Sequence, residues 1–160
     1  MGAGGAARAV IAALDQIHAE KITIFDLVQE KIENIISDMK SAVKMNILSG
    51  KQENLDDTIK KARLLINATP AGMWPFVNNM PFLDANNIDA SMVVFDLVPK
   101  PIKTKLLKEA EVRGAKIIPG LTMLIGQALA ADEIWLDYHF EKASYHQLIN
   151  ELITQLGKDG

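Results

Sequence analysis

The sequence contains no cysteine, which excludes disulfide bridges, thiolate metal sites and cysteine nucleophiles. It also has no cluster of lysine and arginine, and its formal net charge is −3 at pH 7. A weakly acidic chain is a poor binder of nucleic acid or of an anionic membrane through bulk charge. No apolar run approaches the ~20 residues that span a bilayer, and no signal-peptide pattern is present. We therefore expect a cytoplasmic protein with neither nucleic acid nor membrane as partner.

The composition is that of a folded domain. Apolar residues make up 49% of the 160 residues and charged residues 23%, with a mean hydropathy of +0.09. These values are too apolar for intrinsic disorder. The length allows at most one domain of the common size of about 100–200 residues. Residues 1–160 are therefore expected to form a single domain.

Short apolar segments alternate with helical periodicities along the chain. The expected strands are 21–25, 43–48, 64–66, 92–95 and 116–118. The expected helices are 10–17, 32–39, 55–59, 103–113, 121–135 and 145–156. This alternation predicts an α/β fold in which helices cover both faces of a parallel sheet. Ligands bind such sheets at the carboxyl ends of the strands, so functional residues are expected in the loops that follow.

A glycine-rich turn opens the chain. Gly2, Gly4 and Ala7 fit the pattern G-x-G-x-x-[G/A], which lets a pyrophosphate approach the backbone at a helix N-terminus. The pattern alone is weak, and a purely structural turn is the alternative. An amphipathic helix follows at once, however, and the strand 21–25 ends at Asp26, about 20 residues on, where a ribose-binding acid is expected. The context favours dinucleotide binding.

The strand that should precede the glycines is missing, because Met1 stands where that strand should end. In this type of sheet it is the first strand and lies in the middle. We therefore expect a Rossmann-like, doubly wound parallel sheet that lacks its first strand and is followed by carboxyl-terminal helices. Either the sequence is a fragment, or another segment supplies the strand.

Asp26 favours NAD over NADP. Its carboxylate can accept hydrogen bonds from the adenosine ribose and repels a 2′-phosphate, whereas an NADP site would favour arginine or lysine just after this strand. The next four residues, 27–30, contain no base, and the first is Lys31. The alternative is that Asp26 caps the following helix, and both roles could hold.

Four segments, in this order and spacing, resemble the shikimate/quinate dehydrogenase family. They are Gly2-Ala3-Gly4-Gly5-Ala6-Ala7, Asn67-Ala68-Thr69-Pro70-Ala71-Gly72-Met73, Asp96 with Pro101 and Thr104-Lys105-Leu106-Leu107, and Gly120-Leu121-Thr122-Met123-Leu124-Ile125-Gly126-Gln127. The resemblance covers nearly the whole chain but only the family's carboxyl-terminal half. It implies a dinucleotide domain that faces an amino-terminal substrate domain across a cleft. It also implies reversible reduction of 3-dehydroshikimate or 3-dehydroquinate with NADPH or NADH, in aromatic amino-acid biosynthesis or quinate metabolism.

The resemblance also implies roles for individual residues. The implied cofactor-binding residues are Gly2, Ala3, Gly4, Gly5, Ala6, Asp26, Asn67, Ala68, Thr69, Leu97, Gly120 and Met123. Gln127 is implied to hydrogen-bond a hydroxyl group of a shikimate- or quinate-type substrate, with a core glutamine as the alternative. Asn67 and Thr69 also suit ordinary turn positions, and Met123 suits core packing.

Two departures from the family pattern stand out. The family usually carries Asp-x-x-Tyr-x-Pro, but Pro99 occupies the tyrosine position here and cannot donate a hydrogen bond. The family's catalytic Lys–Asp pair belongs to the substrate domain, so no catalytic residue is expected in this chain. By itself the chain should bind a dinucleotide weakly and turn over nothing.

The last two predicted helices, 121–135 and 145–156, carry more apolar surface than one small domain can bury. In the resembled family they pack toward the substrate domain, so an exposed apolar face is expected, which commonly marks a partner or a homodimer contact. Trp135, by contrast, is expected in the core. His18, His139 and His146 are scattered and suit surface or capping positions, so no metal site is predicted.

Three hypotheses follow from the sequence. The first is the NAD(P)-binding part of a shikimate- or quinate-type dehydrogenase. The second is a non-catalytic dinucleotide-binding module that pairs with a separate chain. The third is a related dehydrogenase with another substrate, which Pro99 would favour.

Overall fold

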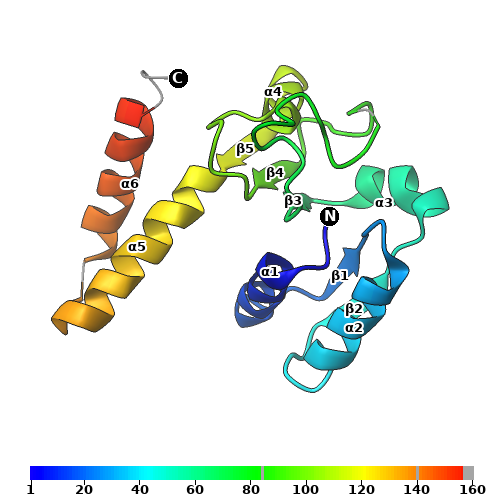
Figure 1. The fold of residues 1–160 in the computed structure, drawn as a ribbon, viewed down its shortest axis with the longest axis horizontal. Coiled ribbons are helices and arrows are strands. Elements are labelled where there is room, and N and C mark those ends of the chain that lie inside the picture. The colour runs from blue at the N-terminus through cyan, green and yellow to red at the C-terminus, as the bar shows by residue number, and fades with distance from the viewer. Residues whose placement is uncertain (84, 140, 157–160) are drawn as a thin grey trace.

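The structure, a computed structural model, describes residues 1–83, 85–139 and 141–156 (Figure 1). Its elements are α1 (Gly5–Gln16), β1 (Lys21–Ile24), α2 (Gln29–Met39), β2 (Asn46–Ser49), η1 (Gln52–Asn54), α3 (Leu55–Lys61), β3 (Leu64–Asn67), β4 (Val93–Asp96), α4 (Lys105–Val112), β5 (Lys116–Pro119), α5 (Gly120–Leu136) and α6 (Lys142–Leu156). The predicted order of strands and helices is confirmed. The largest shift is in α1, which begins at Gly5 rather than residue 10, and β2 begins at Asn46 rather than residue 43. The predictions for α6 and for the histidines also refer to Tyr145, His146 and Leu156. The side chains of these three residues lie outside what the structure describes.

The strands are parallel, as predicted, but the described strands form two sheets rather than one. β1 pairs with β2, and β3, β4 and β5 form the other sheet in that order. Lys21 lies opposite Asn46, and Leu64 lies opposite Val93, which also pairs with Lys116. Helices lie on both sides of these sheets, so the predicted α/β class is confirmed.

Met1 lies in the gap between β1 and β3 and joins the two sheets. Its amino group donates to the carbonyl oxygen of Ile66 at 2.8 Å, and its carbonyl oxygen accepts from the N–H of Ala68, also at 2.8 Å. The N–H of Gly2 donates to the carbonyl oxygen of Phe25 at 2.7 Å. A single residue therefore stands in the position where the sequence predicts the end of the missing strand.

Each sheet has its own apolar core. The core beside β1 and β2 contains Ala3, Ala7, Ile11, Ile24, Ile32, Ile35 and Met45. The core beside β3, β4 and β5 includes Leu65, Met92, Val94, Leu106, Leu107 and Ala110. Burying a large aliphatic side chain contributes about 1.5–3 kcal/mol. Packing of the helices on the sheets thus fixes the strand ends on which the loops depend.

The last two helices extend away from the sheets. α5 continues directly from β5, and α6 returns beside it (Figure 1). Leu129 of α5 is buried, but Ile134 and Trp135 are 80% and 78% exposed. The predicted exposed apolar face is present, whereas the prediction that Trp135 lies in the core is wrong, because this turn of α5 lies beyond the sheets. None of the described helices is both long and apolar enough to cross a membrane.

Candidate functional site

The glycine-rich loop lies against the end of β3. Gly2 has a φ of +93°, a conformation that L-residues with side chains rarely adopt. A Cβ at this position would lie 2.9 Å from the carbonyl carbon and oxygen of Ala68 and 3.0 Å from Cγ2 of Thr69. Glycine is therefore required here, and the contact brings together Gly2, Ala68 and Thr69, as the sequence predicts for a shared site.

The start of α1 is open to solvent. Gly4 is the N-cap residue and forms no side-chain cap, and a Cβ at Gly4 or Gly5 would meet nothing within 4 Å. Gly4, Gly5 and Ala6 are exposed. The first N–H groups of a helix have no partner inside the helix and carry partial positive charge. This end of α1 has the chemistry of an anion site.

Gly2 and Ala3 have a different part in the same loop. The N–H of Gly2 donates to the carbonyl oxygen of Phe25, and the N–H of Ala3 donates to Oδ2 of Asp26 at 2.9 Å. These two residues hold the loop in place. Of the five cofactor-binding residues predicted in this loop, Gly2 to Ala6, the exposed ones are Gly4, Gly5 and Ala6.

Asp26 fixes the glycine loop to the end of β1. Besides accepting from Ala3, the carboxylate accepts from the N–H of Val28 at 3.0 Å through Oδ1. Val28, not Asp26, is the N-cap residue of α2, so the alternative that Asp26 caps this helix is wrong. A carboxylate has about four lone-pair positions, so Asp26 retains acceptor capacity toward a ligand.

Asn67 and Thr69 form the turn that follows β3. Oδ1 of Asn67 accepts from the backbone N–H and the hydroxyl group of Thr69, at 3.0 and 2.7 Å. Nδ2 of Asn67 donates to the carbonyl oxygen of Ala71 at 3.2 Å. Asn67 ends β3 and Thr69 lies in the turn that follows, so these hydrogen bonds fit the interpretation of both as turn-forming residues. Their position along a dinucleotide remains a prediction, and the half-buried Thr69 lies beside Gly2.

A buried polar network connects this turn to the end of β4. Asn67, Asp96 and Thr104 are each 0% exposed. Oδ1 of Asp96 accepts from Nδ2 of Asn67 at 2.9 Å and from the N–H of Val98 at 3.1 Å. Its other oxygen, Oδ2, accepts from the hydroxyl group of Thr104 at 2.6 Å. Asp96 therefore closes the turn after β4.

Burial raises the pKa of Asp96 above its usual value, and the hydrogen bonds from Thr104, Val98 and Asn67 act in the opposite direction. The part played by Thr104 is not predicted from the sequence. Thr104 is the N-cap residue of α4 and accepts from the N–H of Leu107. A threonine directly before a helical periodicity is the signal that could have indicated it.

Leu97 and Gly120 meet at the ends of β4 and β5. A Cβ at Gly120 would lie 2.5 Å from the carbonyl carbon and oxygen of Leu97, so the two backbones touch. Leu97 and Gly120 are buried, whereas Met123 is half-buried one turn further along α5. The structure thus brings together two of the predicted cofactor-binding residues.

Gln127 lies one turn of α5 beyond Met123, and the spacing of Gly120, Met123 and Gln127 puts all three on one face of the helix. Gln127 is exposed. The alternative of a core glutamine is therefore wrong, and a polar group is available to a ligand on this face. Contact with a substrate remains a prediction.

The arrangement defines a class of protein. A parallel α/β fold, a glycine turn at a helix N-terminus and an acid at the end of the next strand together define a Rossmann-type dinucleotide-binding domain. No protein-family model matches the chain. Individual proteins of known function and structure do.

A shikimate dehydrogenase (NADP+) from Methanocaldococcus jannaschii is 40% identical over 137 residues, which are 84% of this chain and 47% of that protein. The quinate dehydrogenase from Corynebacterium glutamicum in complex with NAD superposes with a TM-score of 0.81 at 26% identity, over 96% of this chain and 53% of that one. The shikimate 5-dehydrogenase from Listeria monocytogenes in complex with shikimate and NAD superposes with a TM-score of 0.79 at 28% identity, over 92% of this chain and 53% of that one.

The chain corresponds to the carboxyl-terminal, dinucleotide-binding half of the shikimate/quinate dehydrogenase family, as the sequence motifs indicate. It spans about half the length of the curated relatives it matches.

Proposed function

We propose that this chain binds NAD(P) as part of a dehydrogenase that reversibly reduces a 3-dehydroshikimate- or 3-dehydroquinate-type substrate. The observation that carries the proposal is the contact set around the glycine turn, where Gly2 lies against Ala68 and Asp26 holds Ala3. The likeness to shikimate and quinate dehydrogenases supports the same function. Aromatic amino-acid biosynthesis or quinate metabolism, in the cytoplasm, is the corresponding proposed setting.

Together the proposed residues would contact each part of a dinucleotide. The exposed first turn of α1, from Gly4 to Ala6, would hold the pyrophosphate with backbone N–H groups. Asp26 would accept from the adenosine ribose. Leu97 and Gly120, whose backbones touch, would flank the nicotinamide. When bound, the cofactor supplies or accepts the hydride.

We propose that NAD is preferred to NADP. The carboxylate of Asp26 is held at a fixed position by the N–H groups of Ala3 and Val28, so it cannot easily turn away from a 2′-phosphate. Leu27 is 96% exposed and Glu30 follows in the first turn of α2, so the residues that follow Asp26 along the chain carry no positive charge before Lys31. The curated relatives are named for NADP+, and the solved neighbours include NAD complexes.

We propose that residues 1–160 act as a single cofactor domain that works with a substrate domain. The residues that turn over substrate would belong to that domain, because none is expected here. The exposed apolar side chains of the last two helices suit contact with it. They are Leu124, Ile134, Trp135, Leu136 and Leu148. Gln127 on α5 would then reach the substrate from the cofactor side.

A second candidate is a related dehydrogenase with a different substrate. Pro99 lies directly after the buried turn of Leu97 and Val98 and is half-buried. It replaces the tyrosine of the family pattern and has no hydroxyl or N–H group to donate. A substrate that lacks the matching acceptor would suit this position.

A pair of exposed alanines on α1 tests cofactor binding. Ala6 lies in the first turn and Ala13 near the other end of the same helix. Ala6→Glu places a carboxylate where the pyrophosphate should bind, and should weaken NAD+ binding about tenfold or more in isothermal titration. The helix itself should tolerate the change, because an acid suits a helix N-terminus. Ala13→Glu is the control and should leave binding unchanged. Equal affinity for both variants would contradict the proposed site.

A further inference from the structure

The two sheets divide the proposed dinucleotide site into two halves. β1, which Asp26 follows closely, pairs with β2, whereas β3, β4 and β5 form the other sheet. A Rossmann-type fold binds one mononucleotide on each half, at the carboxyl ends of the strands. Because Asp26 would accept from the adenosine ribose, the nicotinamide half of the cofactor would lie over the ends of β3, β4 and β5.

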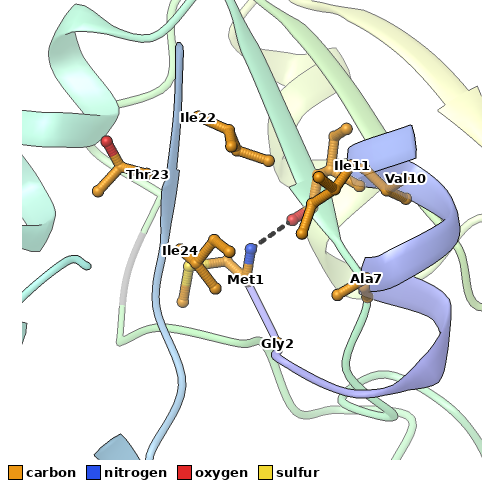
Figure 2. A pocket seen from close by; sticks show the side chains of 10 residues that line it. Met1, Gly2, Ala7, Val10, Ile11, Ile22, Thr23 and Ile24 are labelled. Carbon is orange, nitrogen blue, oxygen red and sulfur yellow. Dashed lines mark hydrogen bonds between the residues drawn. The ribbon is translucent and has the colours of Figure 1, made fainter. Parts of the chain in front are cut away.

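The glycine turn lies against the end of β3. Figure 2 shows Met1 and Gly2 between β1 and α1. The N–H of Ala68, which follows β3, donates to the carbonyl oxygen of Met1 at 2.8 Å. A Cβ at Gly2 would lie 3.0 Å from Cγ2 of Thr69. The residues that follow β3 therefore contact the turn that is proposed to hold the pyrophosphate.

The ends of β3, β4 and β5 are in register. Asn67 lies opposite Asp96, which in turn lies opposite Pro119. The N–H of Leu97 donates to the carbonyl oxygen of Asn67 at 2.9 Å. On the other side, a Cβ at Gly120 would lie 2.5 Å from the carbonyl oxygen of Leu97. The turn after β4 therefore contacts the ends of both neighbouring strands.

Thr104 supports this turn through Asp96. Its hydroxyl group donates to Oδ2 of Asp96 at 2.6 Å, and Oδ1 of the same carboxylate accepts from the N–H of Val98 at 3.1 Å. The methyl group of Thr104 faces the turn after β3, because a Cβ at Gly72 would lie 3.3 Å from Cγ2 of Thr104. Thr104 and Asp96 are each 0% exposed. Any effect that they have on a ligand must therefore pass through the backbone of Leu97 and Val98.

We propose that Thr104 is a positioning residue for the nicotinamide half of the cofactor and acts through Asp96 on the turn at Leu97 and Val98, an inference that rests on the proposed function. The hydrogen bonds that the structure gives Thr104 and the carboxylate of Asp96 all lie within β3, α4 and the turns beside them. The adenosine half lies over the other sheet. Loss of the Thr104 hydroxyl group therefore weakens contacts to the nicotinamide half and spares those to the adenosine half.

Separate titrations with the two halves of the cofactor test the proposal. The probes are adenosine monophosphate, nicotinamide mononucleotide and NAD+, each titrated into the full chain and followed by NMR. Thr104→Val replaces only the hydroxyl group and keeps the methyl group beside Gly72. It should weaken binding of nicotinamide mononucleotide and NAD+ about tenfold and leave that of adenosine monophosphate unchanged. A general loss of stability would instead lower all three affinities alike.

Two further variants provide the rescue and the control. Thr104→Ser keeps the hydroxyl group and should restore binding of nicotinamide mononucleotide. Thr58→Val removes a threonine hydroxyl group of α3 that donates to the carbonyl oxygen of Asn54, and should change none of the three affinities. Circular dichroism checks that each variant is folded.

The unmodified chain provides a test that needs no variant. The N–H groups of Val98 and Leu107 donate to Asp96 and Thr104, so their amide signals should move with nicotinamide mononucleotide and not with adenosine monophosphate. The opposite pattern would overturn the proposal, as would equal losses of both mononucleotides in Thr104→Val. NAD+ binding that Thr104→Val leaves unaltered would overturn the inference alone. An unmodified chain that binds none of the three probes would contradict the proposed function, and the inference with it.

Discussion

At the scale of single residues, close approach decides which glycines are replaceable. Gly2 and Gly120 each touch the backbone of a neighbouring strand end, Ala68 and Leu97, whereas Gly5 has open space around its Cβ position. The motif G-x-G-x-x-[G/A] specifies glycine at positions 2 and 4 and leaves position 5 open, but it does not say what each residue contacts. The structure shows that Gly2 lets strand ends meet, and that Gly5 leaves the helix terminus uncovered.

Gly120→Ala and Gly5→Ala should change the free energy of unfolding in opposite directions. The first puts a Cβ 2.5 Å from backbone atoms of Leu97 and should lower the free energy of unfolding by about 2 kcal/mol or more, a typical cost of an overpacked site. The second adds a methyl group in open space within α1 and should raise it by about 0.5–1 kcal/mol. Urea denaturation of both variants measures this, and equal effects would contradict the close approach of β4 and α5.

Asp26 and Leu27 should control cofactor choice. Asp26→Asn removes the charge that repels a 2′-phosphate, and Leu27→Arg, at a side chain that is 96% exposed, adds a cation beside it. The double variant should shift the ratio of NADP to NAD affinity about tenfold toward NADP. Leu27→Gln alone is the control and should leave the ratio unchanged. An unaltered ratio of NADP to NAD affinity in the double variant would contradict a role for Asp26 in the cofactor site.

At the scale of elements, the polar network couples two loops. Asn67, Asp96 and Thr104 tie the turn after β3 to the end of β4 and the start of α4. Because every bond is buried, loss of one partner leaves a polar group without compensation. The network therefore fixes the loop that carries Leu97 relative to the loop that carries Thr69.

Thr104→Val should destabilise the protein in a pH-dependent way. The substitution removes the hydroxyl group that donates to Oδ2 of Asp96, and should lower the free energy of unfolding by about 1–3 kcal/mol at neutral pH. Since the pKa of Asp96 is raised in the folded state, the folded chain binds more protons than the unfolded chain between the two pKa values, and stability falls as pH rises through that window. The variant raises the pKa further, so its deficit should shrink toward acid pH. A deficit independent of pH, measured by urea unfolding, would contradict this role.

The sequence predicts the elements well because each depends on local patterning. The β-branched run at Ile22 to Ile24 identifies β1, and the helical spacing of Ile32 and Ile35 identifies α2, without reference to the rest of the fold. The prediction that Trp135 lies in the core fails for the opposite reason. Whether an apolar helical residue is buried depends on what the helix packs against, and α5 continues past the sheets. The pairing of Thr104 with Asp96 likewise depends on tertiary placement.

At the scale of the whole molecule, the split sheet is the dominant feature. The motif order predicts a missing first strand, but not how the two sides connect. In the structure Met1 pairs with the end of β3 through its amino and carbonyl groups, and the N–H of Gly2 donates to the carbonyl oxygen of Phe25 at the end of β1. The candidate site straddles this junction, with the glycine turn on one side and Ala68 on the other.

The chain that begins at Met1 should gain stability between about pH 6 and pH 8. Burial lowers the pKa of the amino group from 8.0 to about 6, so the unfolded state binds more protons in this range and folding becomes more favourable as pH rises. The full effect is about 2–3 kcal/mol, at 1.36 kcal/mol per pKa unit. Acetylation of the amino group removes the charge and should flatten the profile. Equal pH profiles for the free and acetylated chains would contradict a buried amino group.

The most direct measurement is an NMR titration of the full chain with NAD+. Binding at the proposed site should move the amide signals of Gly4, Gly5 and Ala6 together with those of Leu97 and Gly120, and leave those of the distant Ala13 and Trp135 unchanged. Shifts confined to other surfaces, or none at saturating NAD+, would contradict the assignment of this α/β fold as a dinucleotide-binding domain.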